Sequence, residues 1–580
     1  MNFLGNTFMT VYKNRLYPNY WDIFAFIFFF SLILVFAWNA KQMTVPYQLG
    51  TSIPISLDPR SLPFYALRTV MRMLIALAFS LLFTLTIATW AAKSKRAKGF
   101  IIPLIDILQS VPILGFLSIT VVGFIKLFPG SLLGPECAAI FAIFTSQAWN
   151  MALGFYQTVF TVPADLQEVA SMFHLSAWQR FWRIEVAYSL PGLLWNMMVS
   201  MSAGWFFVVA SEAISVANQQ ILLPGIGSYI AVAIQEANLQ AIFYAIMTMF
   251  VVILLYDQIL FRPLVAWAEK FKAENIASQR EVRSWLMSML QRTRLVRYGG
   301  AKINLLWNAF VNMRWPAFPY RFSFKPATTS RRSWFFIYLE EIIFWLLMLL
   351  LILFGGAYFI HHFSWQVLQS IFFLGTLTAL RVFILVFLSS LIWVPIGVYI
   401  GLRPALAQVV QPLAQFLAAF PANLFYPLVI MAVVMFHINP ELGLTPLMIL
   451  GAQWYILFNV IAGASLLPKD FLDVADNFDI GTWLRWRRVI LPGIFPYYIT
   501  GAITAAGGTW NASIVAEVVS WGQTTVKIPG LGAYISDQTA QGNFTQTALA
   551  IGVMSLLVLV INRLFWRPLY VLALNRFVLD

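Results

Sequence analysis

Two glutamates stand at matching places in strongly apolar stretches of this chain. Glu212 and Glu517 each follow a tryptophan by seven residues, in stretches interrupted by small and polar residues at 202–205 and 507–511. A carboxylate at membrane depth is costly, so it is by default a functional candidate. The sequence leaves two interpretations open. Each carboxylate either faces a solute path or lies near the end of its helix, where Ser, Thr or backbone groups satisfy it.

A second matched pair of segments carries prolines within apolar runs. Gln109-Ser110-Val111-Pro112 and Ala419-Phe420-Pro421-Ala422 are each predicted to interrupt a helix. An interruption would free backbone groups that can line a cavity, whereas a simple proline kink would not. The sequence favours the kink without excluding the cavity. The residues that we predict to line a path are Gln109, Ser110, Trp205, Glu212, Trp510, Asn511 and Glu517.

Other chemistry finds little support in the sequence. The single cysteine, Cys137, permits no internal disulfide and fits a small packing residue. The four histidines, His174, His361, His362 and His437, show no spacing typical of metal ligands. Because no nucleophile, base or metal set converges, we predict neither an enzyme nor a metal site.

The composition predicts a membrane protein. Hydrophobic residues make up 60% of the chain and charged residues 10%, against roughly 25% charged in soluble domains. Long apolar runs without strand-like alternation indicate helices that cross a hydrocarbon core. Twelve spans are expected, near 22–38, 64–92, 101–127, 132–158, 191–215, 241–262, 335–360, 368–401, 408–436, 442–466, 493–520 and 545–566. The first lacks the features of a cleavable signal peptide, so we expect it to stay as an anchor.

Positive charge is concentrated in one connector. Residues 262–332 hold 14 Lys or Arg and 3 Asp or Glu, which is +11 of the chain's formal +14. The positive-inside rule therefore predicts that this connector and both termini are cytoplasmic. The same charge is explained by anionic lipid at the membrane surface, so we expect a lipid contact and no nucleic-acid partner.

The chain repeats itself. At a shift of 305 residues, Pro163 meets Pro468, Trp205 meets Trp510 and Glu212 meets Glu517. Upstream the shift becomes 309 at Pro112 and then 313, where Ala66-Leu67-Arg68 meets Ala379-Leu380-Arg381. Because an even number of crossings separates equivalent points, the two halves are predicted to share one orientation, as parallel repeats do.

The most polar segment of each repeat follows its fourth predicted span. Both segments place a proline shortly before an aspartate, Asp165 or Asp470, a pattern that begins a helix. Apolar residues at helical spacing then predict a short amphipathic helix outside the membrane. A helix lying against headgroups is one interpretation. Recurrence of the acidic start in both repeats favours a helix shaped to dock another protein.

These segments resemble the EAA loop of binding-protein-dependent ABC transporter permeases. Glu168-Val169-Ala170 and Asp473-Val474-Ala475 match its first three positions. His174 and Asp479 stand where the family has glycine, and Gly481 follows nearby. Val489-Ile490-Leu491-Pro492 keeps the family's ending, whereas the first loop has Val186-Ala187 there. The unequal endings predict that the two loops respond unequally to equivalent substitutions.

The resemblance implies an all-α polytopic protein with about twelve helices in two tandem parallel repeats. It divides the chain into a first permease unit (1–261, loop 162–191), a basic cytoplasmic linker (262–333) and a second unit (334–580, loop 467–496). The loop helices would couple to separate ATPase subunits. The coupling residues it implies are Asp165, Glu168, Val169, Ala170, Phe173, His174, Asp470, Asp473, Val474, Ala475, Phe478, Asp479 and Gly481.

The expected function is therefore the permease subunit of an ATP-driven importer in a bacterial inner membrane. The chain contains no Gly-x4-Gly-Lys-Ser/Thr motif, so we expect ATP and Mg²⁺ to bind two partner ATPases, identical or different, and no cofactor on this chain. An external solute-binding protein would deliver substrate. The Trp-x6-Glu spacing and the following Pro-Gly resemble the nitrate, taurine and sulfonate branch, which implies a small anion. The alternative is a secondary transporter driven by an ion gradient.

Overall fold

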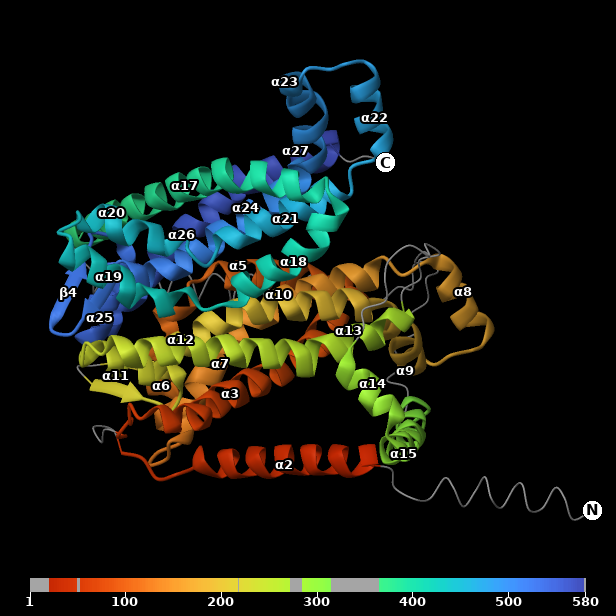
Figure 1. Ribbon diagram of the computed structural model, residues 1–580, viewed down its shortest axis with the longest axis horizontal. Coiled ribbons are helices and arrows are strands. Elements are labelled where there is room, and N and C mark those ends of the chain that lie inside the picture. The colour runs from red at the N-terminus through yellow and green to blue at the C-terminus, as the bar shows by residue number, and fades with distance from the viewer. Residues whose placement is uncertain (1–19, 49–52, 217–218, 272–283, 314–364, 578–580) are drawn as a thin grey trace, which may run out of the picture.

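The protein is a bundle of long helices with two short β-hairpins at one end (Figure 1). The structure, a computed structural model, describes residues 20–48, 53–216, 219–271, 284–313 and 365–577. In Figure 1 the helices of residues 20–268 occupy the lower part of the bundle and those of residues 365–577 the upper part. Two helical projections, around α8 and α22, extend from the end opposite the hairpins.

The described residues of the first half form fourteen α-helices and strands. Its helices and strands are α2 (Tyr20–Gln42), α3 (Leu62–Phe83), α4 (Thr89–Lys93), α5 (Lys95–Ser110), α6 (Ile113–Leu127), α7 (Leu133–Phe160), α8 (Ala164–Met172), α9 (Ala177–Arg180), α10 (Val186–Glu212), β1 (Ala213–Val216), β2 (Gln219–Leu222), α11 (Ile226–Gln235), α12 (Leu239–Tyr256) and α13 (Arg262–Ala268). The connector contributes α14 (Trp285–Arg292) and α15 (Arg294–Val311).

The second half repeats most of this order. Its elements are α17 (Trp365–Gly401), α18 (Pro404–Ala419), α19 (Tyr426–Met435), α20 (Pro440–Leu444), α21 (Gln453–Ser465), α22 (Lys469–Asn477), α23 (Thr482–Arg485), α24 (Leu491–Ala516), β3 (Val518–Trp521), β4 (Thr524–Lys527), α25 (Leu531–Ala540), α26 (Phe544–Ile561) and α27 (Arg567–Phe577). From α8 and α22 onward, equivalent elements begin 305 residues apart, the shift that the sequence predicts.

The repeat extends to irregular details of the backbone. One π-helical turn precedes α10 at Phe181–Glu185 and its counterpart precedes α24 at Trp486–Ile490. A further pair follows α12 at Asp257–Phe261 and α26 at Asn562–Trp566. Because π-turns are rare and occur mostly as single insertions within α-helices, their recurrence at one shift shows that the halves share a fold.

Within the described residues, eight helices are long and apolar enough to cross a membrane, or up to ten if two bent pairs each form one span. The predicted span 101–127 is divided between α5 and α6, and the predicted span 335–360 lies outside the described residues. The prediction of an all-α polytopic membrane protein with two repeats is confirmed. α2 has few buried residues and lies at the edge of the bundle (Figure 1).

The predicted spans 191–215 and 493–520 end earlier than the sequence suggests. α10 ends at Glu212 and α24 at Ala516, and an antiparallel hairpin follows each helix. β-branched residues after each glutamate favour strands over helix. Two β-hairpins therefore occupy residues that the sequence assigned to helix ends, and each hairpin leads into a short apolar helix, α11 or α25.

The halves differ most where the second half bends. The helices Pro404–Ala419 and Ala422–Met435 meet at 74°, and Pro440–Met448 meets Gln453–Ser465 at 46°. The first half has one continuous helix, α7, in place of the second of these bent pairs. α7 packs along α10 and α21 along α24. One hydrophobic core contains residues of both halves, among them Leu117, Leu223, Ile456 and Ile514, so the halves form one packed body.

Candidate functional site

A cavity of about 470 Å³ lies between the two halves. The first half lines it with α5, α6, α7 and α10, and the second half with the segments between α18 and α21, with α24 and with α26. Amide and hydroxyl groups supply its polar lining, including those of Asn150, Ser200, Asn459 and Thr504. None of the described residues that line it is charged. Such a wall suits a small polar solute held by hydrogen bonds and aromatic faces.

The breaks at the matched prolines form part of this cavity. Gln109 and Ile113 line it beside the first break, and Phe420 and Ala422 line it at the second. The backbone N–H of Ile113 donates a hydrogen bond of 2.8 Å to the Asn511 side chain of the other half. Both breaks therefore do more than kink a helix, because residues at each of them line the cavity, and the first break also bonds to the other half.

The residues predicted to line a path fall into two groups. Gln109, Trp510 and Asn511 line the cavity, and Ser110 is the last residue of α5 beside it. Trp205 is buried and its ring packs edge to face on Tyr256, with centroids 5.4 Å apart. Glu212 and Glu517 also lie outside the cavity lining. The structure thus brings three predicted residues to the cavity wall and places Trp205 and the two glutamates elsewhere.

An aromatic pair joins the halves at the cavity. The Trp195 ring of α10 stacks on the Phe458 ring of α21 with centroids 5.3 Å apart and planes 21° from parallel. Both residues line the cavity. At the 305-residue shift their counterparts are Thr500 and Leu153, so the pair occurs once rather than twice. The pair lies in the part of the cavity nearer the N-terminal end of α10, which follows the loop.

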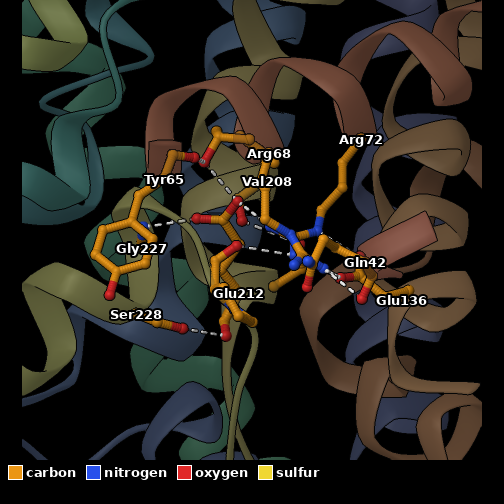
Figure 2. Close-up of polar contacts among 12 residues, drawn as sticks. Gln42, Tyr65, Arg68, Arg72, Glu136, Val208, Glu212, Gly227 and Ser228 are labelled. Atoms are coloured by element: carbon orange, nitrogen blue, oxygen red, sulfur yellow. Dashed lines mark hydrogen bonds and ion pairs between the residues drawn. The ribbon is translucent and has the colours of Figure 1, made fainter. Parts of the chain in front are cut away.

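Glu212 belongs to a fully buried group of charges, the first charge cluster, made by Arg68, Arg72, Glu136 and Glu212 (Figure 2). Arg72 contacts both carboxylates at 2.6 Å, and Arg68 contacts Glu136 at 2.8 Å. Two positive and two negative charges balance. Because a buried charge is tolerated only when paired and hydrogen-bonded, this cluster satisfies Glu212 within the protein.

Neutral groups complete the satisfaction of Glu212. The Thr69 hydroxyl donates to its Oε1 at 2.7 Å and the Gly227 backbone N–H donates to its Oε2 at 2.6 Å. The neighbouring Gly225 packs so closely that a Cβ there would overlap the Glu212 carboxylate. The Pro-Gly-Ile-Gly sequence after the hairpin is thus explained by close approach of backbone to this carboxylate.

The second half contains a reduced version, the second charge cluster, made by Arg381, Glu441 and Glu517. Arg381 bonds Glu441 at 2.8 Å and contacts Glu517 at 3.4 Å. Thr378 donates to Glu517 at 2.8 Å, as Thr69 does to Glu212. The Glu441 side chain is 46% exposed, whereas Glu136 is fully buried.

These contacts correct one detail of the sequence comparison. Arg68 was expected to match Arg381, but Arg72 is its counterpart, since Arg72 and Arg381 each bond a hairpin-side glutamate and a proline carbonyl. The shift at this point is therefore 309 rather than 313. Leu377 then stands where the first half has Arg68. The second charge cluster lacks one positive charge.

The two loop helices, α8 and α22, project from the end of the bundle opposite the hairpins (Figure 1). Each presents exposed carboxylates beside exposed apolar side chains and buries one alanine, Ala170 or Ala475. Phe173 is 75% exposed and Phe478 is 77% exposed. The other predicted coupling residues that are exposed are Asp165, Glu168, Val169, His174, Asp470, Asp473, Val474, Asp479 and Gly481.

Both loop helices end in a Schellman motif. The N–H of Leu175 bonds the Ala170 carbonyl and that of Ile480 bonds the Ala475 carbonyl, at 3.0 and 2.9 Å. His174 and Asp479 adopt φ of +50° and +49°. This left-handed position is the one at which the resembling family has glycine, so both loops keep the turn although neither keeps the residue. Exposed apolar and acidic groups on a fixed turn form a surface suited to another protein.

Comparison with known proteins gives the family. The model of the binding-protein-dependent transport system inner membrane component matches residues 80–262 and again residues 393–567. These two matches cover more than half of the chain. The chain belongs to this family. Each match includes one loop helix and the following long helix, so the prediction of a permease with two family domains is confirmed.

Curated relatives of this transport component each match about a third of the chain. The bicarbonate transport system permease protein CmpB of Synechococcus elongatus is 30% identical over 176 residues, which is 30% of this chain and 60% of that protein. The nitrate import permease protein NrtB of Leptolyngbya laminosa is 26% identical over 196 residues, 34% of this chain and 67% of that protein. The glycine betaine/proline betaine permease ProW of Escherichia coli is 30% identical over 164 residues, 28% of this chain and 44% of that protein.

In this transport component the described part of the connector, residues 284–313, packs on the first loop. The Trp178 indole N–H donates to the Phe310 carbonyl of α15 at 3.0 Å, and the Arg183 guanidinium donates to Asn312 at 3.0 Å. The rings of Trp182 and Trp307 lie 5.0 Å apart. Trp483, the counterpart of Trp178, is 77% exposed.

Sequence reasoning missed the residues around the glutamates. Thr69, Arg72 and Glu136 recur as Thr378, Arg381 and Glu441 at shifts of 309 and 305. Extending the 309-residue shift upstream from Pro112 would have paired Thr69 with Thr378 and Arg72 with Arg381. The sequence therefore contained this match, but an accidental match of Ala-Leu-Arg at a shift of 313 obscured it.

Proposed function

We propose that the chain is the transmembrane subunit of an ATP-driven importer, with residues 1–261 and 334–580 as its two permease units and 262–333 as a cytoplasmic linker. The observation that carries this proposal is an uncharged cavity between two repeated units whose exposed loop helices project at one end. The coupling residues named above would seat in two ATPase subunits, which bind ATP and Mg²⁺. The loops and both termini would face the cytoplasm of a bacterial cell.

The two loops would transmit the work of the ATPases to the cavity. α8 and α22 are short helices held by a fixed turn, and the π-turn and long helix that follow each loop lead directly to cavity-lining residues on α10 and α24. Closure of the ATPase pair would draw the loops together and rotate the units as rigid bodies. Access to the cavity would then alternate between the two sides of the membrane.

We infer a small oxyanion as the substrate, delivered by a solute-binding protein. Amide N–H and hydroxyl donors in the cavity can replace the hydration of such an anion, and the relatives named for bicarbonate and nitrate support this class. Glu212 and Glu517 would not repel it, because both are paired outside the cavity. Their pairing also argues against the alternative of a gradient-driven carrier that uses these carboxylates.

A reconstituted system tests this function. The chain, its copurified ATPase and its binding protein are assembled in vesicles, and uptake of bicarbonate, nitrate and glycine betaine is measured with ATP hydrolysis. We expect ATP-dependent uptake of an oxyanion. Glu168→Lys with Asp473→Lys should leave basal hydrolysis of the ATPase intact and abolish its coupling to uptake. Uptake by the isolated chain under an ion gradient alone would contradict the proposal.

Single reversals refine the same test. Glu168 and Asp473 are both exposed on their loop helices, but α15 covers only the first loop. We expect Asp473→Lys to impair coupling more than Glu168→Lys, because no described helix of the connector holds the second loop in place. Equal impairment would remove the asymmetry and leave the two-unit architecture untouched.

A further inference from the structure

A second cavity of about 240 Å³ lies at the hairpin end of the bundle. It is bounded by both hairpins, by α11 and by the start of α19. Its polar lining comes from Gln220, Gln235, Asn423 and Ser520. Like the first cavity, it has no charged residue among the described residues that line it. Both halves contribute to it, so it lies on the same interface as the larger cavity.

One segment of the second half lines both cavities. We call residues 420–427 the septum. Phe420 and Ala422 line the larger cavity, Asn423 and Pro427 line the smaller one, and Tyr426 lines both. The septum contains the 74° bend between Pro404–Ala419 and Ala422–Met435. The septum is therefore a break between two helices that borders both cavities.

The septum is held at two points. Tyr426 is buried, and its phenol O–H donates to the Leu447 carbonyl at 3.1 Å. Leu447 lies in the second bent pair, next to the cavity residue Met448. The Asn423 amide donates a long bond of 3.4 Å to the Phe206 carbonyl of α10, across the interface. One anchor thus lies within the second half and the other reaches the first half.

The septum also carries an unsatisfied polar atom. The Asn423 side-chain oxygen is buried, and no described residue hydrogen-bonds it. A buried acceptor without a partner costs about 1–3 kcal/mol. Because Asn423 lines the smaller cavity, a hydrogen-bond donor in that cavity, such as water or a hydrated solute, would satisfy this oxygen.

In the first half, no described residue at the positions equivalent to the septum lines the smaller cavity. At the 309-residue shift Asn423 corresponds to Leu114 and Tyr426 to Leu117, and both leucines are buried in the hydrophobic core. Within the described residues, only the second unit therefore contributes such a segment. The hairpin of the second half adds a cross-unit contact, in which the Gly522 N–H donates to the Ile234 carbonyl at 2.9 Å.

We propose that the smaller cavity is the outer vestibule of the solute path and that the septum is its gate, with Tyr426 as the gating residue and Asn423 as the polar group that contacts the solute on entry. This inference rests on the proposed function for the direction of the path. Rotation of the units would move Phe206 away from Asn423, and this releases the anchor between the halves. The freed septum would then shift within the second half, break the bond of Tyr426 to Leu447 and make the two cavities continuous.

Accessibility of engineered cysteines tests the gate without ATPase or substrate. In a Cys137→Ala background, Thr504→Cys reports on the larger cavity and Ser520→Cys on the smaller one. A charged, membrane-impermeant maleimide is added from outside to right-side-out vesicles. We expect rapid labelling of Ser520→Cys and slow labelling of Thr504→Cys. Rapid labelling of both would overturn the proposal.

The septum variants then supply the decisive comparison. Tyr426→Ala should accelerate labelling of Thr504→Cys by roughly tenfold or more, because a buried ring is removed. Tyr426→Phe keeps the ring and loses one hydrogen bond, so a rise of roughly fivefold is expected. Leu117→Ala, the matched change in the first half, should leave the rate within about twofold, since this leucine lines neither cavity.

Each remaining outcome is informative. Tyr426→Phe is the safeguard against misfolding, and size-exclusion profiles show whether each variant remains a folded monodisperse protein. Unchanged labelling in a folded Tyr426→Ala chain would overturn the gate. Protection of Ser520→Cys from outside, with reaction in inverted vesicles, would overturn the assignment of this cavity to the outer side. Because no ATP is added, failed coupling of the loops would leave these labelling results unaffected.

Discussion

The two charge clusters occupy equivalent places in one repeated fold and differ in how completely they are paired. In the first, Arg72 bridges two fully buried carboxylates and Arg68 adds a second positive charge. In the second, Arg381 stands alone between Glu517 and a half-exposed Glu441. The comparison teaches that the scaffold needs one arginine to hold the glutamate after its long helix. The remaining charges adjust to local burial.

The largest expected effect comes from removing the shared arginine. Arg72→Met would leave Glu212 without a cationic partner in a fully buried site, which costs about 3–5 kcal/mol. Arg381→Met should cost less, because Glu441 can turn to water and only Glu517 is buried. Thermal unfolding in detergent measures the difference. Equal losses of stability would show that burial does not distinguish the clusters.

A smaller effect is expected from converting the first charge cluster toward the second. Arg68→Leu introduces leucine, the residue found at the equivalent position 377 of the second half. It removes one hydrogen bond to Glu136 and keeps both contacts of Arg72. We expect a loss of about 1–3 kcal/mol, typical of a bond to a charged group. Leu377→Ala is the control variant in the second half. It removes an uncharged side chain, so its effect on stability should not depend on salt.

These clusters also show what the sequence could and could not predict. The shift of 305 residues correctly pairs the two halves from α8 and α22 onward, because loops, glycines and prolines recur without a gap. The shift could not show that Glu212 on α10 bonds Arg72 on α3. That contact depends on how the helices pack and bury the two side chains. Residues 213–215 and 518–520 were assigned to helices because apolar strands and apolar helix ends look alike over a few residues.

The cavity was only partly predictable for a similar reason. Asn511 and Gln109 stood out because polar residues interrupt apolar runs there. Trp195 and Phe458 did not, since aromatic residues in a membrane helix carry no periodic signal that separates a cavity from lipid. Only the packing of one half on the other reveals that these two rings meet.

The connector provides a third contrast between the units. Phe310 packs its ring on Trp178 at 5.1 Å and on Trp182 at 5.7 Å, and the second loop has no such neighbour among the described residues. Phe310→Ala should remove about 1–2 kcal/mol of local stability, as expected for two aromatic contacts. Hydrogen exchange at 177–185 should then accelerate toward the rate at 482–490. Ile303→Ala, at a 67% exposed position of the same helix, is the matched control and should leave both segments unchanged.

The smallest expected effect is on the stability of the loop helices, and it should be the same in both units. His174 and Asp479 both hold a left-handed backbone at the end of their loop helices. A side chain in this conformation costs roughly 1–2 kcal/mol, and glycine avoids that cost but loses more entropy on folding. His174→Gly and Asp479→Gly should therefore each stabilise their loop helix by only about 0.5 kcal/mol.

Hydrogen exchange in α8 and α22 measures both changes, with Ser171→Gly and Asp476→Gly as controls inside each helix, where glycine should destabilise. A gain in one loop and a loss in the other would mean that the side chain of His174 or Asp479 contributes something beyond the turn. Because φ differs by only one degree between the two positions, the backbone itself gives no reason for unequal results. Any asymmetry of the two loops would then come from their neighbours. α15 contacts the first loop, whereas Trp483 in the second loop is exposed.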